Sequence, residues 1–173
     1  NRLDRDTTGL TIVAKHALAG GILGNAVAKR AIHRTYYAVC SGCTPACMRI
    51  SAPIARKDAS TIERCVDFKR GEYAVTDFIR IKYNPDNNLS LDKLRLLTGR
   101  THQIRVHMKY IGFPLIGDFL YNPDYTYISR QALHSGRLVF THPVTGQKMN
   151  LISDIPSDMK SVYFILFVWD MPF

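Results

Sequence analysis

The chain has 173 residues, of which 46% are hydrophobic and 21% are charged, a balance that predicts one folded domain and argues against disorder. The formal net charge of +9 favours a polyanionic partner, and nucleic acid fits better than an acidic membrane because no basic amphipathic helix with an aromatic face is evident. The longest apolar run, Tyr163 to Trp169, is too short to span a membrane, so we expect a terminal helix or strand packed on the core.

The chain begins with an unusually charged turn. Arg2 to Gly9 contains two aspartates, two arginines and two threonines and ends on a glycine. A carboxylate held among arginines, such as Asp4 or Asp6, is available as a nucleophile, a base or a metal ligand. A solvated polar turn before a strand has the same composition, so this segment alone leaves both interpretations open.

Two regular elements are expected next. Leu10 to Ala14 is apolar and β-branched and predicts a buried strand, and Ala17 to Ile32 predicts a helix. Gly20, Gly21 and Gly24 lie inside this helix and indicate close packing against a neighbouring element. They do not indicate a phosphate-binding loop, because no Gly-Lys-Ser/Thr sequence follows them.

The middle of the chain predicts an antiparallel meander, with a loop through Pro45 and Pro53 after its first strand. Tyr36 and Tyr37 are adjacent in that strand and must face opposite sides of the sheet. In the last strand the alternation of leucines slips near Asp92. The expected strands are Thr35 to Cys40, Thr61 to Phe68, Ala74 to Tyr83 and Leu89 to Leu97.

The second half of the chain predicts one clear helix and a C-terminal hairpin. The helix is expected to begin after Gly99, with Thr101 as its N-cap and Ile104, Met108 and Ile111 as its buried stripe. A helix or strand, a turn, a returning strand and a last helix then follow, at Gln131 to Phe140, His142 to Gly146, Lys148 to Ile152 and from Pro156 onward.

Basic residues in and before the predicted helix point to an anion. Arg100 in its first turn, together with free backbone amides, can bind an anion or hold a carboxylate. Arg105 lies beside the apolar stripe, where an arginine is costly unless it pairs with an acid or a substrate phosphate. His102 and His107 are five residues apart and do not share a helix face, so we expect hydrogen-bonded structural histidines and no metal pair.

The four cysteines do not form a recognisable framework. Cys40 and Cys43 have the spacing of half a zinc knuckle, but no second closely spaced Cys or His pair follows. We therefore expect unpaired thiols of a cytosolic protein and no structural zinc.

Three separated motifs resemble those of the RluA-type pseudouridine synthases, which isomerise uridine to pseudouridine in ribosomal or transfer RNA. The octet from Arg2 resembles the family's Arg-Leu-Asp-x-x-Thr-Ser-Gly motif, and Gly99 to His107 matches its Gly-Arg-Thr-His-Gln-Ile-Arg-Val-His motif in full. The family's basic-x-Tyr-x-Ala-x-Val-x-Gly strand is matched by Arg34, Tyr36, Ala38, Cys40 and Gly42. Later signatures are matched by Pro114, Gly117, Asp118, Tyr121, Arg130 to His134 and Phe140 to Gly146.

The resemblance implies an α+β fold with a mixed, mostly antiparallel sheet and flanking helices, formed by residues 1–173 as a single catalytic domain. It implies that Asp4 is catalytic, that Tyr36 lies under the uracil ring and that Arg105 pairs with the aspartate, all in one cleft. No cofactor or metal is implied, and we expect a cytoplasmic monomer that binds ribosomal or transfer RNA and no membrane. Weaker candidates for RNA contacts are Arg2, Arg5, Arg100, His102, Lys109, His134 and Arg137.

The sequence also departs from the family pattern. Asn1, Thr8, Cys40 and Phe113 stand where the family often has His, Ser, Val and His, and none of these positions has an assigned role. The family's catalytic domain begins some tens of residues before its Asp motif, so we expect its first strands, and any S4-type RNA-binding domain ahead of them, to be missing. Such a chain is expected to expose an apolar sheet edge or face and to have weak or no activity alone.

Two other functions share some of these features. A non-catalytic basic RNA-binding module would need no buried acid. A divalent-metal phosphodiesterase built on Asp4 and Asp6 would need further acids nearby, and Arg2 and Arg5 would repel its metal. The sequence therefore favours a metal-free isomerase.

Overall fold

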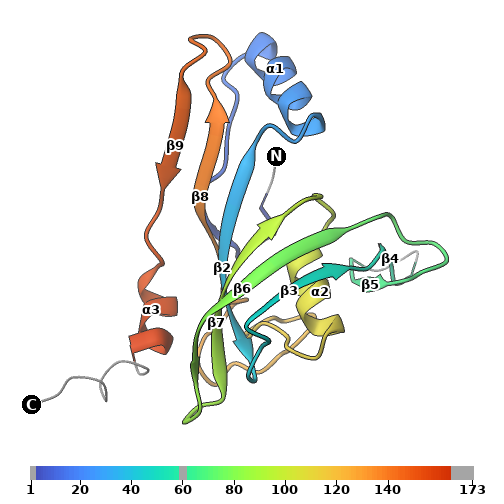
Figure 1. Cartoon of the computed structure of the whole chain (residues 1–173), viewed down its shortest axis with the longest axis vertical. Helices are drawn as coiled ribbons and strands as arrows, with labels where there is room; N and C mark the ends of the chain where they lie inside the picture. The colour runs from blue at the N-terminus through green and yellow to red at the C-terminus, as the bar shows by residue number, and fades with distance from the viewer. Residues whose placement is uncertain (1–2, 59–61, 165–173) are drawn as a thin grey trace, which may run out of the picture.

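A computed structural model describes residues 3–58 and 62–164 of the chain (Figure 1). In chain order the elements are β1 (Thr8–Gly9), α1 (Ala17–Ala28), β2 (His33–Ser41), β3 (Cys47–Ser51), β4 (Ile54–Arg56), β5 (Arg64–Val66), β6 (Val75–Asn84), β7 (Leu89–Leu96), α2 (Gln103–Tyr110), β8 (Leu133–Thr141), β9 (Lys148–Ile152) and α3 (Ser157–Phe164). No helix in these two ranges has both the length and the apolar character needed to cross a membrane.

The described strands form one large sheet and one small one. The large sheet has the order β1-β8-β2-β7-β6-β3, with β9 also paired to β8, and the small sheet is the β4–β5 hairpin. Within the described strands the short β1–β8 pair is parallel and the other pairs are antiparallel. The predicted α+β fold, with its mixed and mostly antiparallel sheet, is confirmed.

The large sheet is covered on both faces. Tyr36, Ala38 and Cys40 of β2 alternate toward α2 and pack with its Ile104 and Met108. The opposite face is covered by α3 and by the connection between α2 and β8, through a cluster that includes Val39, Leu89, Leu91, Ile116, Ile128, Met159 and Val162. Figure 1 shows α2 beside the β4–β5 hairpin, with α1 at the opposite end of β2.

The predicted slip in the leucine pattern of β7 has a structural cause. Leu89 and Leu91 pack in the cluster under α3, whereas Leu94 packs on the face covered by α2. A β-bulge in β6, between Arg80 and Lys82, lies opposite this point of β7. The leucines therefore change phase because the covered face of the strand changes.

The predicted strand at Leu10 to Ala14 is wrong, because β1 ends at Gly9. Two strands pair with the same edge of β8. β1 pairs with His134 and Ser135, and β9 pairs with the next stretch, Arg137 to Thr141. The chain therefore leaves β8 after Leu10, whose amide still donates to the Ser135 carbonyl. At the crossing, Gly9 has φ 104°, and a Cβ there would lie 2.3 Å from the Ser135 carbonyl oxygen, so only glycine fits.

The predicted helix over Ala17 to Ile32 is shorter, since α1 ends at Ala28 and Arg30 adopts a left-handed conformation with φ 57°. The expectation that its glycines mark close packing is also wrong. A Cβ added at Gly21 or Gly24 would meet no atom within 4 Å, and one at Gly20 would meet only the Ala14 Cβ, at 3.7 Å. This helix lies loosely on the sheet through Leu23.

The loop expected through Pro45 and Pro53 contains two strands, β3 and β4, and the strand expected at Thr61 to Phe68 is limited to β5. In β3 only Ile50 is buried, because this strand forms the edge of the sheet. An edge strand with one buried side chain lacks the alternation of apolar and polar residues that predicts a strand.

The C-terminal predictions agree with the structure. The predicted helix or strand at Gln131 to Phe140 corresponds to β8, and the hairpin to β9 and the start of α3 are confirmed. Residues 165–169 of the predicted terminal apolar element lie outside the described ranges.

Candidate active site

A pocket of about 200 Å³ opens between the N-terminal turn, β2 and the start of α2. The three residues predicted to be catalytic, Asp4, Tyr36 and Arg105, all line it. They come from segments far apart in sequence, so the fold brings them together. The other lining residues are Leu3, Thr7, Val27, Arg34, Leu96, Gly99, Arg100, Thr101, His102, Gln103, Ile104 and Leu133.

Asp4 is held in the pocket by a turn that is anchored from outside. Its carbonyl accepts a hydrogen bond of 3.1 Å from the Thr7 amide. The Gln131 carboxamide donates to the carbonyl of Arg5 and, over 3.2 Å, to the Thr7 hydroxyl. These bonds fix the backbone on both sides of Asp4, whose side chain remains 20% exposed.

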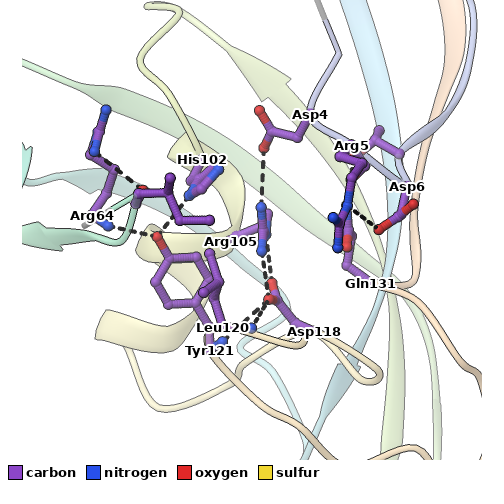
Figure 2. Close-up of polar contacts among 12 residues, drawn as sticks. Asp4, Arg5, Asp6, Arg64, His102, Arg105, Asp118, Leu120, Tyr121 and Gln131 are labelled. Carbon is purple, nitrogen blue, oxygen red and sulfur yellow. Dashed lines mark hydrogen bonds and ion pairs between the residues drawn. The ribbon is translucent and has the colours of Figure 1, made fainter. Parts of the chain in front are cut away.

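The two acids of the turn point in different directions (Figure 2). Asp4 faces Arg105, with its Oδ2 3.6 Å from Nη1, whereas Asp6 pairs over 3.1 Å with Arg5 at the surface. Asp6 itself has φ 66°, which turns the chain sharply after Asp4. The described residues contain no group of three or more His, Cys, Asp and Glu side chains that could hold a metal.

Arg105 is almost completely buried, with 1% of its side chain exposed. Its Nε and Nη2 donate to both carboxylate oxygens of Asp118, each over 2.7 Å. Although burial opposes the charge, the hydrogen bonds to Asp118 raise the pKa of Arg105 above its usual value. The predicted ion pair of Arg105 with Asp4 is present at Nη1, and Asp118 is a second, bidentate partner that was not predicted.

Sequence reasoning assigned no role to Asp118. The side chain is fully buried and also accepts hydrogen bonds from the amides of Leu120 and Tyr121, at 3.1 and 3.2 Å. The signal was available, because a buried arginine requires an acid and Asp118 follows a glycine turn 13 residues after Arg105.

Tyr36 contributes the aromatic surface of the pocket. It is 6% exposed, and burial raises the pKa of its hydroxyl while the nearby Arg34 charge opposes this. A bulge in the pairing of β2 with β8 lies beside it, since Thr35 pairs with Arg137 and Tyr36 with Ser135. As predicted, Tyr36 and its neighbour Tyr37 face opposite sides of the sheet.

His102 closes one side of the pocket and begins α2, in place of the predicted N-cap Thr101. It has φ 57° and makes no side-chain cap. Its Nδ1 lies 2.9 Å from the Tyr121 hydroxyl, which accepts a hydrogen bond from the Arg64 amide (Figure 2). Burial, together with the charge of Arg105, lowers the pKa of His102, which favours the neutral imidazole.

Comparison with known proteins identifies the family of the chain. Residues 1–110 match the model of the family described as RNA pseudouridylate synthase. The chain belongs to this family. The resemblance stated from the three motifs is thereby confirmed.

Among the relatives of the chain is an uncharacterized RNA pseudouridine synthase of Bacillus subtilis, YjbO, which is 46% identical over 163 residues. That match covers 93% of the chain and 56% of the relative. Ribosomal large subunit pseudouridine synthase D of Vibrio vulnificus is 40% identical over 173 residues, covering 92% of the chain and 52% of the relative. The chain thus spans about half the length of the curated relatives it matches.

A solved structure supports the fold of this family member independently. The human RNA pseudouridylate synthase domain containing 1 superposes with a TM-score of 0.77 at 22% sequence identity. The superposition covers 100% of the chain and 81% of the human protein.

The residues predicted to contact RNA fall into different environments. Arg100, which precedes α2 instead of lying in its first turn, lines the pocket and pairs with Glu72. Arg5 is exposed, with its guanidinium carbon 5.1 Å from the centre of the Phe119 ring. Lys109 is also exposed and lies 5.5 Å from the Tyr121 ring. Arg2 lies outside the described residues.

Two of these predictions concern β8. His134 is 2% exposed, and its ring nitrogens bond to the Thr8 hydroxyl at 2.9 Å and the Ser153 carbonyl at 3.3 Å. It cannot contact RNA from this position, so that prediction is wrong. Arg137 is exposed and donates to the Asn150 side chain over 2.9 Å, but it does not line the pocket.

The structure also shows the surroundings of His107 and of the four cysteines. His107 is buried and bonds through both ring nitrogens, to the Thr76 hydroxyl and the Ala52 carbonyl, so it is the structural histidine that its spacing indicated. All four cysteines are free; Cys40 is buried, whereas Cys43 and Cys47 are exposed.

Proposed function

We propose that the protein isomerises specific uridines to pseudouridine in ribosomal or transfer RNA, and that Asp4 is the residue that acts on the nucleotide. The supporting observation is that the carboxylate of Asp4 enters a pocket where a buried arginine faces it and a tyrosine lines the wall. This arrangement is the one that the family resemblance assigns to catalysis.

The reaction defines what the pocket must supply. The bond between C1′ and N1 breaks, the uracil rotates, and C5 bonds to C1′. C5 then loses its proton and N1 gains one, so the product is an isomer of the substrate. This isomerisation is redox-neutral and requires no cofactor. Asp4 supplies the nucleophile or base, and Coulomb attraction from Arg105 orients its carboxylate toward the substrate.

The uracil ring needs a surface and a dry environment while it turns. Tyr36 offers its ring to stack against the base, and Leu3, Ile104 and Leu133 supply an apolar lining. A pocket of about 200 Å³ has no room for a base-paired duplex, so the target nucleotide must leave its stack to reach Asp4.

RNA affinity is expected to come from the positive surface around the pocket. The chain carries 23 Lys and Arg against 14 Asp and Glu, and phosphate contacts by such side chains provide affinity that is largely independent of sequence. Arg100 lies at the pocket wall, while Arg5 and Lys109 are exposed at the surface, so these three are the favoured contacts. His134 is not among them.

The function is tested by mapping pseudouridine in total RNA from cells that carry the gene intact, deleted or with Asp4→Asn. We expect the same uridines to lose their modification in the deletion and in the Asp4→Asn strain, and to keep it with Asp6→Asn. An unchanged pseudouridine map in the deletion strain would show that the proposed function is wrong.

Binding and activity assays on the purified protein distinguish the proposed isomerase from a non-catalytic RNA-binding module and from a metal-dependent phosphodiesterase. Asp4→Asn is expected to bind RNA within a few fold of the parent, because the positive surface is unchanged. A non-catalytic RNA-binding module would show no product with the parent protein either. A metal-dependent phosphodiesterase would lose its activity in chelator and would require Asp6 as much as Asp4.

A further inference from the structure

Arg34 on β2 is a charged side chain without a counter-ion. It lies two residues before Tyr36 in the same strand, and it takes part in no ion pair among the described residues. Its Nε and Nη2 are shielded from solvent and have no hydrogen-bond partner. A guanidinium in this state is costly, and an unpaired buried donor requires an explanation.

Arg105 shows that the Nε and Nη2 edge of a guanidinium can bind two oxygens at once. Its own Nε and Nη2 hold both oxygens of Asp118 over 2.7 Å. The same two donors of Arg34 form an equivalent fork, and no acid among the described residues occupies it. The fork matches two oxygens of a phosphate as well as it matches a carboxylate.

The surroundings of Arg34 favour a negatively charged ligand. It lines the pocket that contains Asp4, and it also lines a neighbouring groove of about 560 Å³ between the end of α1, the start of β2 and the end of β7. No acidic side chain lines this groove. Its basic lining residues are Arg30, His33, Arg34, Arg95 and Arg100.

We propose that Arg34 binds the phosphate adjoining the target uridine, and that the groove beside it receives the neighbouring nucleotide. This inference rests on the proposed function, since it names the part of the RNA that lies next to the reacting base. The volume of the groove falls within the range of about 300–1,000 Å³ that is usual for small-molecule sites. Because the side chain is only half-buried and lines both hollows, a rotation about its terminal bonds turns the fork toward an incoming phosphate.

The free protein should show the cost of holding this cation unpaired. Arg34→Met keeps an unbranched apolar stem and removes the charge, so the thermal midpoint of the variant is expected to rise by about 2 to 4 °C in phosphate-free buffer. Inorganic phosphate should then stabilise the parent more than the variant. A residue that merely held the fold together would instead give a lower midpoint when replaced.

The binding test uses three small probes, uridine, uridine 5′-monophosphate and uridine 3′-monophosphate, titrated into the protein and followed by NMR. One monophosphate should bind about tenfold more tightly than uridine, since a charge-assisted hydrogen bond is worth about that factor. The preference should disappear in Arg34→Gln, weaken in Arg34→Lys, which keeps the charge without the fork, and persist in the matched control Arg137→Gln.

The outcomes separate the inference from the function on which it rests. If the monophosphate preference survives Arg34→Gln, or if neither monophosphate binds better than uridine, the assignment of Arg34 is overturned while the function of Asp4 is unaffected. If uridine fails to perturb the pocket but inorganic phosphate still shifts the Arg34 side-chain signals of the parent, the phosphate site stands and the proposed function fails.

Discussion

Asp118→Asn is expected to separate the stability of the site from its chemistry. Asp118 and Arg105 are both buried and share two hydrogen bonds of 2.7 Å. Asparagine has nearly the same shape and retains an oxygen for the amides of Leu120 and Tyr121. The substitution therefore removes the negative charge with little change in packing, and it leaves the guanidinium of Arg105 in the interior without its main counter-charge.

The expected cost follows from this burial. Removing one partner of a buried ion pair typically costs about 3–5 kcal/mol, because the remaining charge is uncompensated. For a chain of this length, that corresponds to a fall in the thermal midpoint of about 6 to 20 °C. Asp4 lies 3.6 Å from Arg105 and is 20% exposed, so Asp4→Asn is expected to cost less than about 1 kcal/mol.

Urea unfolding followed by circular dichroism measures both values, provided that the slope of free energy against urea is unchanged. Asp77→Asn serves as a surface control, because Asp77 pairs with Arg49 and Arg95 at 2.7 and 3.2 Å near solvent. If Asp118→Asn were no more destabilising than these two variants, the conclusion that Asp118 holds the charge of Arg105 would be refuted.

Three further outcomes are expected. Asp4→Asn should abolish pseudouridine formation while Asp6→Asn retains most of it, as measured by product formed in a single turnover; equal losses would point to a metal site. Burial raises the pKa of Asp92 from 3.8 to about 6, so the folded protein retains a proton that the unfolded chain releases between these values, and stability falls as the pH rises through this window. Asp92→Asn should therefore flatten the dependence of the unfolding free energy on pH and add up to about 3 kcal/mol at pH 8; an unchanged slope would exclude this residue. His134→Ala should lower stability without weakening RNA affinity, whereas Lys109→Gln should weaken RNA binding in filter-binding assays without affecting stability, and the reverse pattern would contradict the placement of these two residues.

The motifs correctly indicated that Asp4, Tyr36 and Arg105 lie in one pocket, because each motif is a short local segment. Gly99 to His107 places the start of α2, and the buried stripe of Ile104 and Met108 follows from helical spacing. That Arg105 needs an acid could be argued from its position beside this stripe. Which acid it takes depends on the path of the loop that carries Asp118, and no local pattern contains that path.

Other predictions failed where tertiary structure decides exposure. His134 is as polar in sequence as Arg137, but it lies where β1 and β2 both cover β8, whereas Arg137 lies farther along that strand and is exposed. The apolar residues from Leu10 to Ala14 have the composition of a strand, but β9 already occupies the edge of β8 that they would need. In both cases the outcome depends on which strands pair with β8, and the local sequence does not contain that information.

That competition on β8 also limits where the turn that carries Asp4 can lie. β1 and β9 meet end to end along one strand edge, with β1 on two residues and β9 on the next stretch. β9 therefore limits the pairing of the N-terminal segment. This segment cannot pair with residues farther along β8 unless hydrogen bonds between β8 and β9 are broken. The segment that carries Asp4 is in this way limited on one side by β9, a strand that lies more than 140 residues after Asp4 in the chain.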